Sequence, residues 1–220
     1  KGDLFCMATV LESEDPNLPP GSKAIIFEDG TIEGDLQTIQ LEPDLGSLAA
    51  KVLKENKRRI VDFSDKIRIF IDILCREAQL IVCGAGHIAI SLASFACNVG
   101  FNVTVLDDRS DFAQPSRFPN CKVIAENFTI ALRDMSFGSS TYVVIITRGH
   151  EHDVDCLAEI LQKETAYVGL IGSRRRVSFV LKLLKEKGFS RQRLKGVFTP
   201  IGLPIGAESP EEIALSIVSE

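Results

Sequence analysis

The fold of this 220-residue chain is decided by residues 79–109, QLIVCGAGHIAISLASFACNVGFNVTVLDDR. The stretch begins with a short apolar run, residues 79–83, which predicts a buried parallel strand. The next six residues, Gly84-Ala85-Gly86-His87-Ile88-Ala89, follow the pattern G-x-G-x-x-A. In such a turn the first glycine permits a tight bend and the second lets a phosphate approach the backbone, while the small third residue lets helix and strand pack closely. The pattern therefore predicts a strand–turn–helix unit that binds a nucleotide or a related ligand.

The remainder of the stretch predicts a helix and a second strand. Apolar residues recur at helical spacing at Ile88, Leu92, Phe95 and Val99. Gly100 is the expected end of the helix, and residues 101–106 are the expected strand. Asp107, Asp108 and Arg109 end that strand, near the place where an acidic residue usually holds a ribose hydroxyl. Capping of the strand end is the alternative role for the two aspartates, and Arg109 leaves an NAD-like or NADP-like preference open.

Composition places the chain among ordinary globular proteins. Hydrophobic residues make up 45% of it and charged residues 25%. A net charge of −5 gives no indication of nucleic-acid binding. No apolar run approaches the roughly 18 residues of a membrane span, and the start, residues 1–4, does not resemble a secretory signal. We therefore expect a cytoplasmic protein without nucleic-acid or membrane partners.

The six cysteines show no metal-site or disulfide pattern. They are Cys6, Cys75, Cys83, Cys97, Cys121 and Cys156. The absence of a C-x-x-C pair argues against a zinc ribbon or a small disulfide scaffold. We expect reduced and mostly buried thiols.

The chain divides into two predicted domains. Residues 1–76 form a small β-rich domain of α+β type, with strands over residues 5–12, 23–27, 31–33, 59–63 and 66–74 and one helix over residues 44–56. Residues 77–220 form a Rossmann-like α/β domain, a doubly wound parallel sheet, because strands and helices alternate there. Its further strands are predicted over residues 122–125, 141–147 and 166–171. Its further helices are predicted over residues 150–162, up to Gly188, and after the capping box Ser209-Pro210-Glu211-Glu212.

A ligand of such a sheet binds outside the carboxyl ends of its strands. The loops at those ends supply the candidate binding residues: Gly84, Ala85, Gly86, His87, Asp107, Asp108, Arg109, Thr147, Arg148, Gly149, His150, His152, Gly172, Ser173, Arg174 and Arg175. No residue is assigned a catalytic role.

All three histidines, His87, His150 and His152, fall in these loops. Histidine suits acid–base chemistry or metal ligation near neutral pH, and each could instead cap a helix start. Residues 150–153 could supply metal ligands, but residues two positions apart at a helix start diverge, so no metal site is predicted. Arg174-Arg175-Arg176 occupies the first turn of a predicted helix, where cations are disfavoured. This turn is either a solvated basic surface or an anion site.

Several segments together resemble one family. CGAGHIAISLA, VTVLDDR, VVIITRGHEHD, YVGLIGSRRR and PIGLPIGAESPEEIALSIVSE, all within residues 79–220, resemble the XdhC/CoxI family. The resemblance implies a cytoplasmic maturation factor, not an enzyme, for xanthine dehydrogenase and related molybdenum hydroxylases. Such a factor binds molybdenum cofactor, a phosphate-bearing pterin, presents it for sulfuration and helps to insert it. The implied partners are the hydroxylase apoenzyme and a cysteine desulfurase, and a homodimer stays open.

The first domain departs from the family at one place. Residues 6–12, 20–23 and 28–34 fit its pattern, but residues 35–42 hold neither glycine nor cysteine. Family members carry there a Ser/Gly-rich stretch with a cysteine. If that cysteine binds molybdenum in the family, this chain cannot bind the metal in the same way. Two alternatives therefore remain: an NAD(P)-dependent oxidoreductase and a non-catalytic, nucleotide-binding regulatory module.

Overall fold

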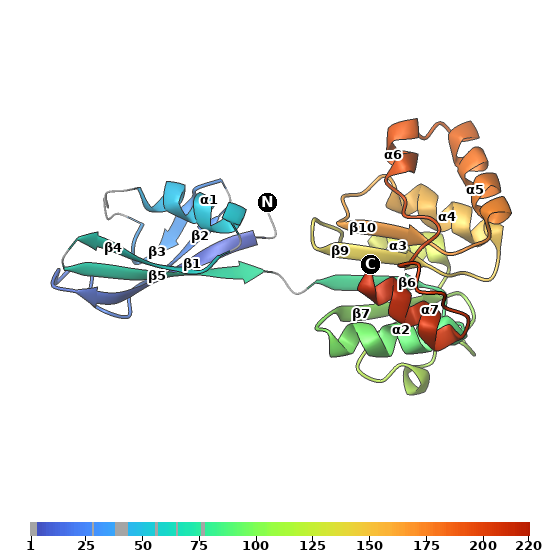
Figure 1. Cartoon of the computed structure of the whole chain (residues 1–220), viewed down its shortest axis with the longest axis horizontal. Helices are drawn as coiled ribbons and strands as arrows, with labels where there is room; N and C mark the ends of the chain where they lie inside the picture. Colours follow the sequence, from blue (N-terminus) through green and yellow to red (C-terminus); the bar gives the residue numbers. More distant parts are fainter. Residues whose placement is uncertain (1–3, 28, 38–43, 56, 65, 76–77) are drawn as a thin grey trace. The chain divides into compact units, whose positions relative to one another are not determined.

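The computed structural model describes residues 4–27, 29–37, 44–55, 57–64, 66–75 and 78–220. The chain forms two compact units, Lys1–Arg76 and Glu77–Glu220. Each contains one five-stranded sheet (Figure 1). Most of residues 35–42, where the sequence departs from the family pattern, lie outside the described residues.

The first unit is an antiparallel sheet with one helix on it. The strand order is β3-β2-β1-β5-β4. Ile69 and Ile71 are fully buried, as the alternation of isoleucines along their strand predicts. They pack with Ala49 and Val52 of the helix. The elements are β1 (Leu4–Ser13), β2 (Lys23–Phe27), β3 (Ile32–Gly34), α1 (Leu45–Glu55), β4 (Arg59–Ser64) and β5 (Ile67–Cys75).

The second unit is the predicted doubly wound α/β fold. All strand pairs of its sheet are parallel, in the order β10-β9-β6-β7-β8. The strands are β6 (Gln79–Cys83), β7 (Asn102–Asp107), β8 (Lys122–Ala125), β9 (Thr141–Ile145) and β10 (Tyr167–Leu170). The helices are α2 (His87–Asn98), η1 (Pro115–Arg117), α3 (Phe128–Asp134), α4 (His150–Ile160), α5 (Arg174–Glu186), α6 (Arg191–Lys195) and α7 (Pro210–Ser219). The prediction of a parallel sheet from alternating strands and helices is confirmed.

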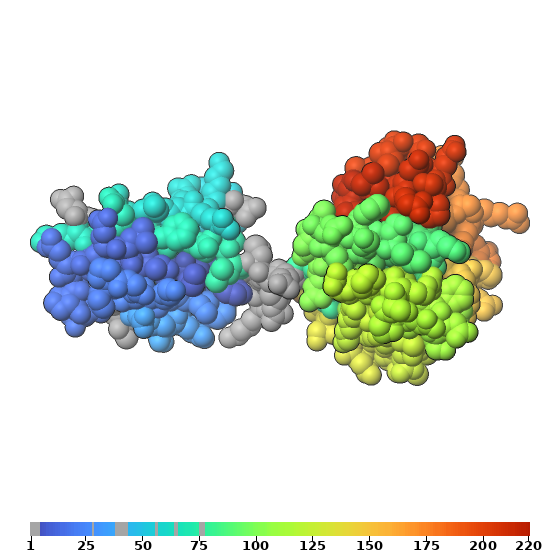
Figure 2. All heavy atoms as spheres, turned by 90° about the horizontal axis from the view of Figure 1, so that it is seen from below, coloured from blue at the N-terminus to red at the C-terminus, as the bar shows by residue number. Residues whose placement is uncertain are grey.

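Helices cover both faces of this sheet, which explains the unbroken apolar run of β6. α2 and α7 lie on one face of the sheet, and α3, α4 and α5 lie on the other (Figure 1). Leu80 and Val82 pack in the core on the first face, whereas Ile81 and Cys83 pack in the core on the second. On the surface of the unit α7 lies alongside α2 (Figure 2). A strand that is buried on both faces needs apolar residues at every position.

The predicted apolar face of α2 is wrong at Val99, whose side chain is 63% exposed. The helix ends at Asn98, so Val99 is its C-cap and turns away from the core. Gly100 follows with φ +94°, the left-handed conformation expected of a helix end. The buried face is built mostly of small residues, Ala89, Leu92, Ala93 and Ala96. These let α2 approach the sheet and α7 closely.

Three features of the second unit were not predicted. The short helices α3 and α6 are absent from the sequence-based assignment, although Asn127 and Ser190 cap them as good N-cap residues do. Phe198 forms a parallel bridge with Gly169 at the edge of β10. If Phe198 is counted as a sixth strand next to β10, the sheet has the strand order of dinucleotide-binding folds.

Candidate functional site

The strand order changes direction at β6, which fixes where a ligand can bind. β7 lies on one side of β6 and β9 on the other. The two chain crossovers therefore leave the sheet on opposite faces, with α2 on one face and α4 on the other. The loops that follow β6, β7, β9 and β10 meet at the carboxyl edge around this point, which is the general ligand position in such sheets. The predicted binding residues lie in these loops, at the end of β7, or in the first turn of α2, α4 or α5.

The loop after β6, here called the glycine loop, contains Gly84 and Gly86, which have different roles. Gly84 has φ +116°, and a Cβ added there would lie 2.5 Å from the carbonyl oxygen of Ile146. Gly84 is therefore required by the fold. Gly86 has φ −74°, which any residue adopts, and a Cβ there would meet nothing within 4 Å. The second glycine leaves open space over the start of α2, and this space is available to a ligand.

Asp107 holds the glycine loop in place. Its side chain is only 1% exposed, and its carboxylate accepts hydrogen bonds from the Ala85 N–H at 2.7 Å and from the Arg109 Nε at 2.8 Å. Burial alone would raise the pKa of Asp107, but these hydrogen bonds outweigh it and lower the pKa below its ordinary value. Both carboxylate oxygens are engaged within the chain. The geometry favours the capping role for Asp107 over ribose binding.

Asp108 and Arg148 form an ion pair across the mouth of the site. The Arg148 guanidinium donates through both terminal nitrogens to the two oxygens of Asp108, with 2.7 Å between Nη2 and Oδ2. The hydrogen bond from Arg148 lowers the pKa of Asp108 to about 2. The pair connects the loop after β7 to the loop after β9. In this structure the Arg148 side chain is therefore paired with Asp108 and is not free to bind a ligand.

A buried ion pair fixes the loop after β9. Asp153 is 0% exposed, and its carboxylate accepts hydrogen bonds from the Thr147 hydroxyl at 2.6 Å and from the Arg176 Nε at 2.7 Å. Arg176 also donates to the Thr147 carbonyl. Burial raises the pKa of Asp153, and its two partners partly offset that rise. Arg176 is thus a structural residue and not a free cation.

The pairing of Asp153 with Arg176 was not predicted: the sequence offered Asp153 only as a possible metal ligand and Arg176 only as part of a basic turn that could bind an anion. The sequence does contain a signal for Asp153, because Asp153, Cys156 and Ile160 recur at helical spacing and all three are buried. A carboxylate on an apolar helix face requires a partner. The sequence indicates the role of Arg176 less clearly, because nothing distinguishes it from the neighbouring arginines Arg174 and Arg175.

The three histidines share an edge of the sheet but do not converge. The ring of His150 lies edge-on to Phe179, with 5.2 Å between centroids, and the ring of His152 lies 5.4 Å from Phe128. His87 is exposed at the first position of α2. Within the described ranges no three His, Cys, Asp or Glu side chains form a group that could hold a metal ion.

Two helix N-termini at this edge lack a side-chain cap. Gly86 precedes α2 and Gly149 precedes α4, and at neither helix start does a capping side chain accept a hydrogen bond from a backbone N–H. The other α-helices of this unit are capped by Asn127, Ser173, Ser190 and Ser209. The uncapped helices are the two that flank the switch in strand order. Free N–H groups at a helix N-terminus, together with the helix dipole, bind anions.

A basic hollow adjoins the start of α4. It measures about 560 Å³ and is lined by His150, Ser173, Arg175, Arg176, Ser178, Phe179 and Lys182. Gly172 and Ser173 lead into α5, where the Ser173 hydroxyl accepts the Arg176 N–H. Arg174 and Arg175 are exposed, and in the part of the chain that the structure describes they pair with no carboxylate. The hollow therefore presents cationic groups that internal partners have not neutralised.

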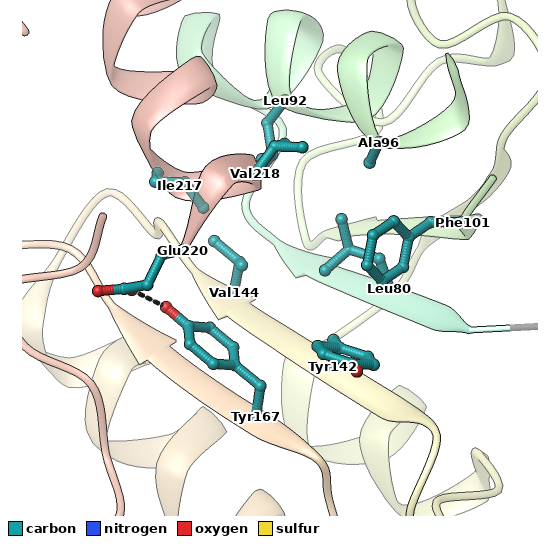
Figure 3. Close-up of a pocket in the computed structure, with 10 residues that line it drawn as sticks. All are labelled: Leu80, Leu92, Ala96, Phe101, Tyr142, Val144, Tyr167, Ile217, Val218 and Glu220. Carbon is teal, nitrogen blue, oxygen red and sulfur yellow. Dashed lines mark hydrogen bonds between the residues drawn. The ribbon is translucent and has the colours of Figure 1, made fainter. Parts of the chain in front are cut away.

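A second, apolar cavity of about 80 Å³ lies elsewhere in the same unit (Figure 3). It is lined by residues near the amino ends of the strands, among them Leu80, Tyr142 and Tyr167. The Tyr167 hydroxyl donates to the Glu220 carboxylate, and burial raises the pKa of Tyr167. This cavity is at the opposite edge of the sheet from the glycine loop. It is separate from the candidate binding site.

Two family models match this chain. The model described as the XdhC Rossmann domain matches residues 80–220, and the model described as the XdhC and CoxI family matches residues 1–64. In the described residues no helix has both the length and the apolar character needed to cross a membrane.

Two curated proteins are similar in sequence. An uncharacterized protein, YqeB of Escherichia coli (strain K12), is 27% identical over 98% of this chain and 42% of its own length. A protein of Bacillus subtilis (strain 168), named as a probable subunit of xanthine dehydrogenase, is 31% identical over 72% of this chain and 46% of its own length. The chain thus spans less than half the length of these curated relatives.

A solved structure shares the fold of the whole chain. The crystal structure of a xanthine dehydrogenase from Bacillus halodurans matches with a TM-score of 0.70 at 24% identity. The match covers 99% of this chain and 61% of that protein. At this identity the likeness concerns the fold alone.

Proposed function

Because the chain belongs to the XdhC and CoxI family, we propose that it is an accessory protein in the maturation of a xanthine dehydrogenase-like molybdenum hydroxylase. In this proposal it binds molybdenum cofactor through the phosphate of the pterin and assists its sulfuration and insertion. Its partners are then the hydroxylase apoenzyme and a cysteine desulfurase. The name of the Bacillus subtilis relative, which refers to xanthine dehydrogenase, supports the link to that enzyme class.

One observation carries the proposal: the two uncapped helix N-termini that flank the switch in strand order. The starts of α2 and α4 offer free backbone N–H groups, and the open space at Gly86 admits a phosphate to the first of them. Arg174 and Arg175 add positive charge at the neighbouring loop. The donors and cations present fit a phosphate-bearing ligand.

At the carboxyl edge of this sheet, the described residues include no exposed cysteine that could bind the metal end of the cofactor. Cys83 is at the end of β6 but is fully buried, and its neighbour in the core, Cys156, is fully buried as well. In the proposal, the second unit therefore binds the phosphate and the pterin of the cofactor. The metal end, when cofactor is bound, is then left accessible for exchange of its sulfur ligand by a partner.

The test is transfer of cofactor to and from the purified chain. The protein is incubated anaerobically with cofactor-loaded extract and repurified, and the pterin is measured as its fluorescent oxidation product. We expect retained pterin and faster activation of the cognate apo-hydroxylase. Charge reversal at Arg191, an exposed arginine of α6 outside the basic hollow, serves as the control and should change neither result. Absence of both pterin and activation would refute the proposal.

An NAD(P)-dependent oxidoreductase is the second candidate, because the strand order and the start of α2 suit a dinucleotide. The acidic residues weigh against it. Asp107 uses both oxygens inside the chain, and Asp108 is paired with Arg148. Calorimetry with NAD, NADH, NADP and NADPH separates the candidates. Tight binding with turnover would establish the oxidoreductase, and tight binding without turnover or pterin transfer would establish a regulatory module.

A further inference from the structure

Two cysteines that are distant in sequence lie side by side in the second unit. Cys97 is in the last turn of α2, and Cys121 immediately precedes β8, 24 positions further along the chain. Their sulfur atoms are 3.6 Å apart, and both side chains are partly exposed. By contrast, Cys6, Cys83 and Cys156 are fully buried. The pair is thus within reach of dissolved reagents, and those three thiols are not.

The turn before β8 holds the pair together. Asn120 has φ +66°, a left-handed conformation that asparagine tolerates better than most residues. Phe118, only 2% exposed, fixes the preceding part of the turn in the core. The Cys121 thiol points to the Pro119 carbonyl at 3.6 Å, and the Cys97 thiol points to the Asn120 carbonyl at 3.9 Å. These are weak donor contacts, so rotation of either thiol loses little.

We propose that Cys97 and Cys121 are a redox-sensitive dithiol that closes to an intramolecular disulfide when a small disulfide such as oxidised glutathione is present. A thiolate of the pair attacks one glutathione sulfur, forming a mixed disulfide and releasing one glutathione thiolate. The second cysteine then attacks the mixed disulfide, forms the Cys97–Cys121 bond and releases the second glutathione. Two protein S–H bonds are lost and two glutathione S–H bonds are formed, so the protein is oxidised by two electrons.

The geometry needs only a small adjustment. A disulfide bond is about 2.05 Å long, so the sulfur atoms at 3.6 Å must approach by about 1.5 Å. Rotation of the two side chains about their Cα–Cβ bonds supplies movement of this size. Burial, together with the hydrogen bond to Cys97, raises the pKa of Cys121 to about 12. Since the thiolate is the reactive form, closure is slow at neutral pH and faster at alkaline pH.

The bond would close a loop that carries part of the candidate site. The segment between the two cysteines contains Asp107, which accepts the Ala85 N–H, and Arg117, which donates to the Ala85 carbonyl at 3.1 Å. Both contacts hold the glycine loop. Oxidation would tie the end of this segment to the end of α2, and so restrain the glycine loop against local opening.

The test oxidises the full chain with oxidised glutathione at pH 8 and maps the peptides without reduction by mass spectrometry. We expect a Cys97–Cys121 linkage that dithiothreitol reverses. The melting temperature should rise by about 5 to 10 °C on closure, because the bond removes loop entropy from the unfolded chain. Cys97→Ser and Cys121→Ser should show no redox-dependent shift, while Cys75→Ser, which leaves the pair intact, should behave like the parent.

Stable glutathione adducts on the pair without closure, or a linkage to another cysteine, would overturn the proposal. A Cys97–Cys121 bond without a rise in melting temperature would contradict the expected stabilisation, and a bond that left hydrogen exchange of the residue 84–86 amides unchanged would overturn the restraint of the glycine loop. The measurement uses no ligand, so its outcome is independent of the proposed function.

Discussion

Gly86→Ala is the substitution that best separates binding from folding. Gly86 has φ −74° and ψ −168°, which alanine adopts without strain, and the added Cβ meets no atom within 4 Å. At such a position alanine stabilises the fold by about 0.4–1 kcal/mol, because it restricts the unfolded chain. The folded protein should therefore lose nothing by the change. The new methyl group, however, occupies the space through which a phosphate would reach the start of α2.

The expected loss of binding follows from the hydrogen bonds that the methyl group blocks. A hydrogen bond from a backbone N–H to a charged oxygen contributes about 1.5–3 kcal/mol. Losing one such bond corresponds to a decrease in affinity of roughly 10- to 100-fold. The change should appear in the dissociation constant for the pterin, measured by fluorescence titration with the isolated cofactor under anaerobic conditions. The melting temperature of Gly86→Ala should equal or slightly exceed that of the parent.

Gly84→Ala is the matched comparison, only two positions away. Its φ of +116° is unfavourable for alanine, and its Cβ would overlap the Ile146 carbonyl oxygen. Backbone strain of this kind costs about 1–3 kcal/mol before the overlap is counted. We expect a melting temperature lower by roughly 5 °C or more. If Gly86→Ala bound the cofactor as tightly as the parent while remaining folded, the helix start of α2 would not be the phosphate site.

Three further variants test individual contacts of the site. Asp153→Ala leaves Arg176 unpaired and should lower the free energy of unfolding by about 3 kcal/mol, measured with urea; a loss below 1 kcal/mol would contradict the buried pair. Asp108→Asn removes a carboxylate whose pKa is lowered from 3.8 to about 2, so the stabilisation by Arg148 is present above pH 3.8 and is lost as the pH falls to about 2. After solvent screening this amounts to about 1 kcal/mol at pH 6, and acid titration of both proteins should show the difference vanish near pH 2. Charge reversal of residues 174–175 should weaken cofactor binding at least tenfold with little change in melting temperature, and unchanged binding would return this turn to the solvated surface.

The fold of the second unit could be predicted because each level of the sequence indicates the same structure. The apolar run of β6, the G-x-G-x-x-A turn and the capping box at Ser209 are local signals, and each agrees with the alternation of strands and helices. The face of α2 was harder to predict. Its contacts use alanines, which are apolar but small, whereas the larger Val99 is exposed beyond the helix end. The size and apolar character of Val99 therefore predicted that it faces the core, whereas it is exposed to solvent.

The site could be predicted as a location but not as a set of contacts. Sequence position placed the polar loops at the carboxyl edge because parallel strands all end there. It did not show that Asp107 holds the glycine loop or that Arg176 is paired with Asp153, since those partners are 22 and 23 residues away. Nor did it show that His150 and His152 contact different aromatic rings. Such pairings depend on side-chain directions that the spacing of strands and helices does not determine.

The internal pairings also indicate what kind of ligand the edge can hold. Asp107, Asp108 and Asp153 are each neutralised by an arginine of the chain. What remains for a ligand is mostly positive: Arg174 and Arg175 at the start of α5, and the uncapped starts of α2 and α4, with Glu151 as an exposed acid in the first turn of α4. A ribose hydroxyl would have to displace Arg148 from Asp108, an exposed pair whose rupture costs only about 1 kcal/mol. A phosphate needs no displacement at all, because it binds where partners are missing. We therefore propose that the site favours a phosphate and only weakly disfavours a ribose. A pterin monophosphate is then the better first ligand to test, and a dinucleotide must be tested beside it.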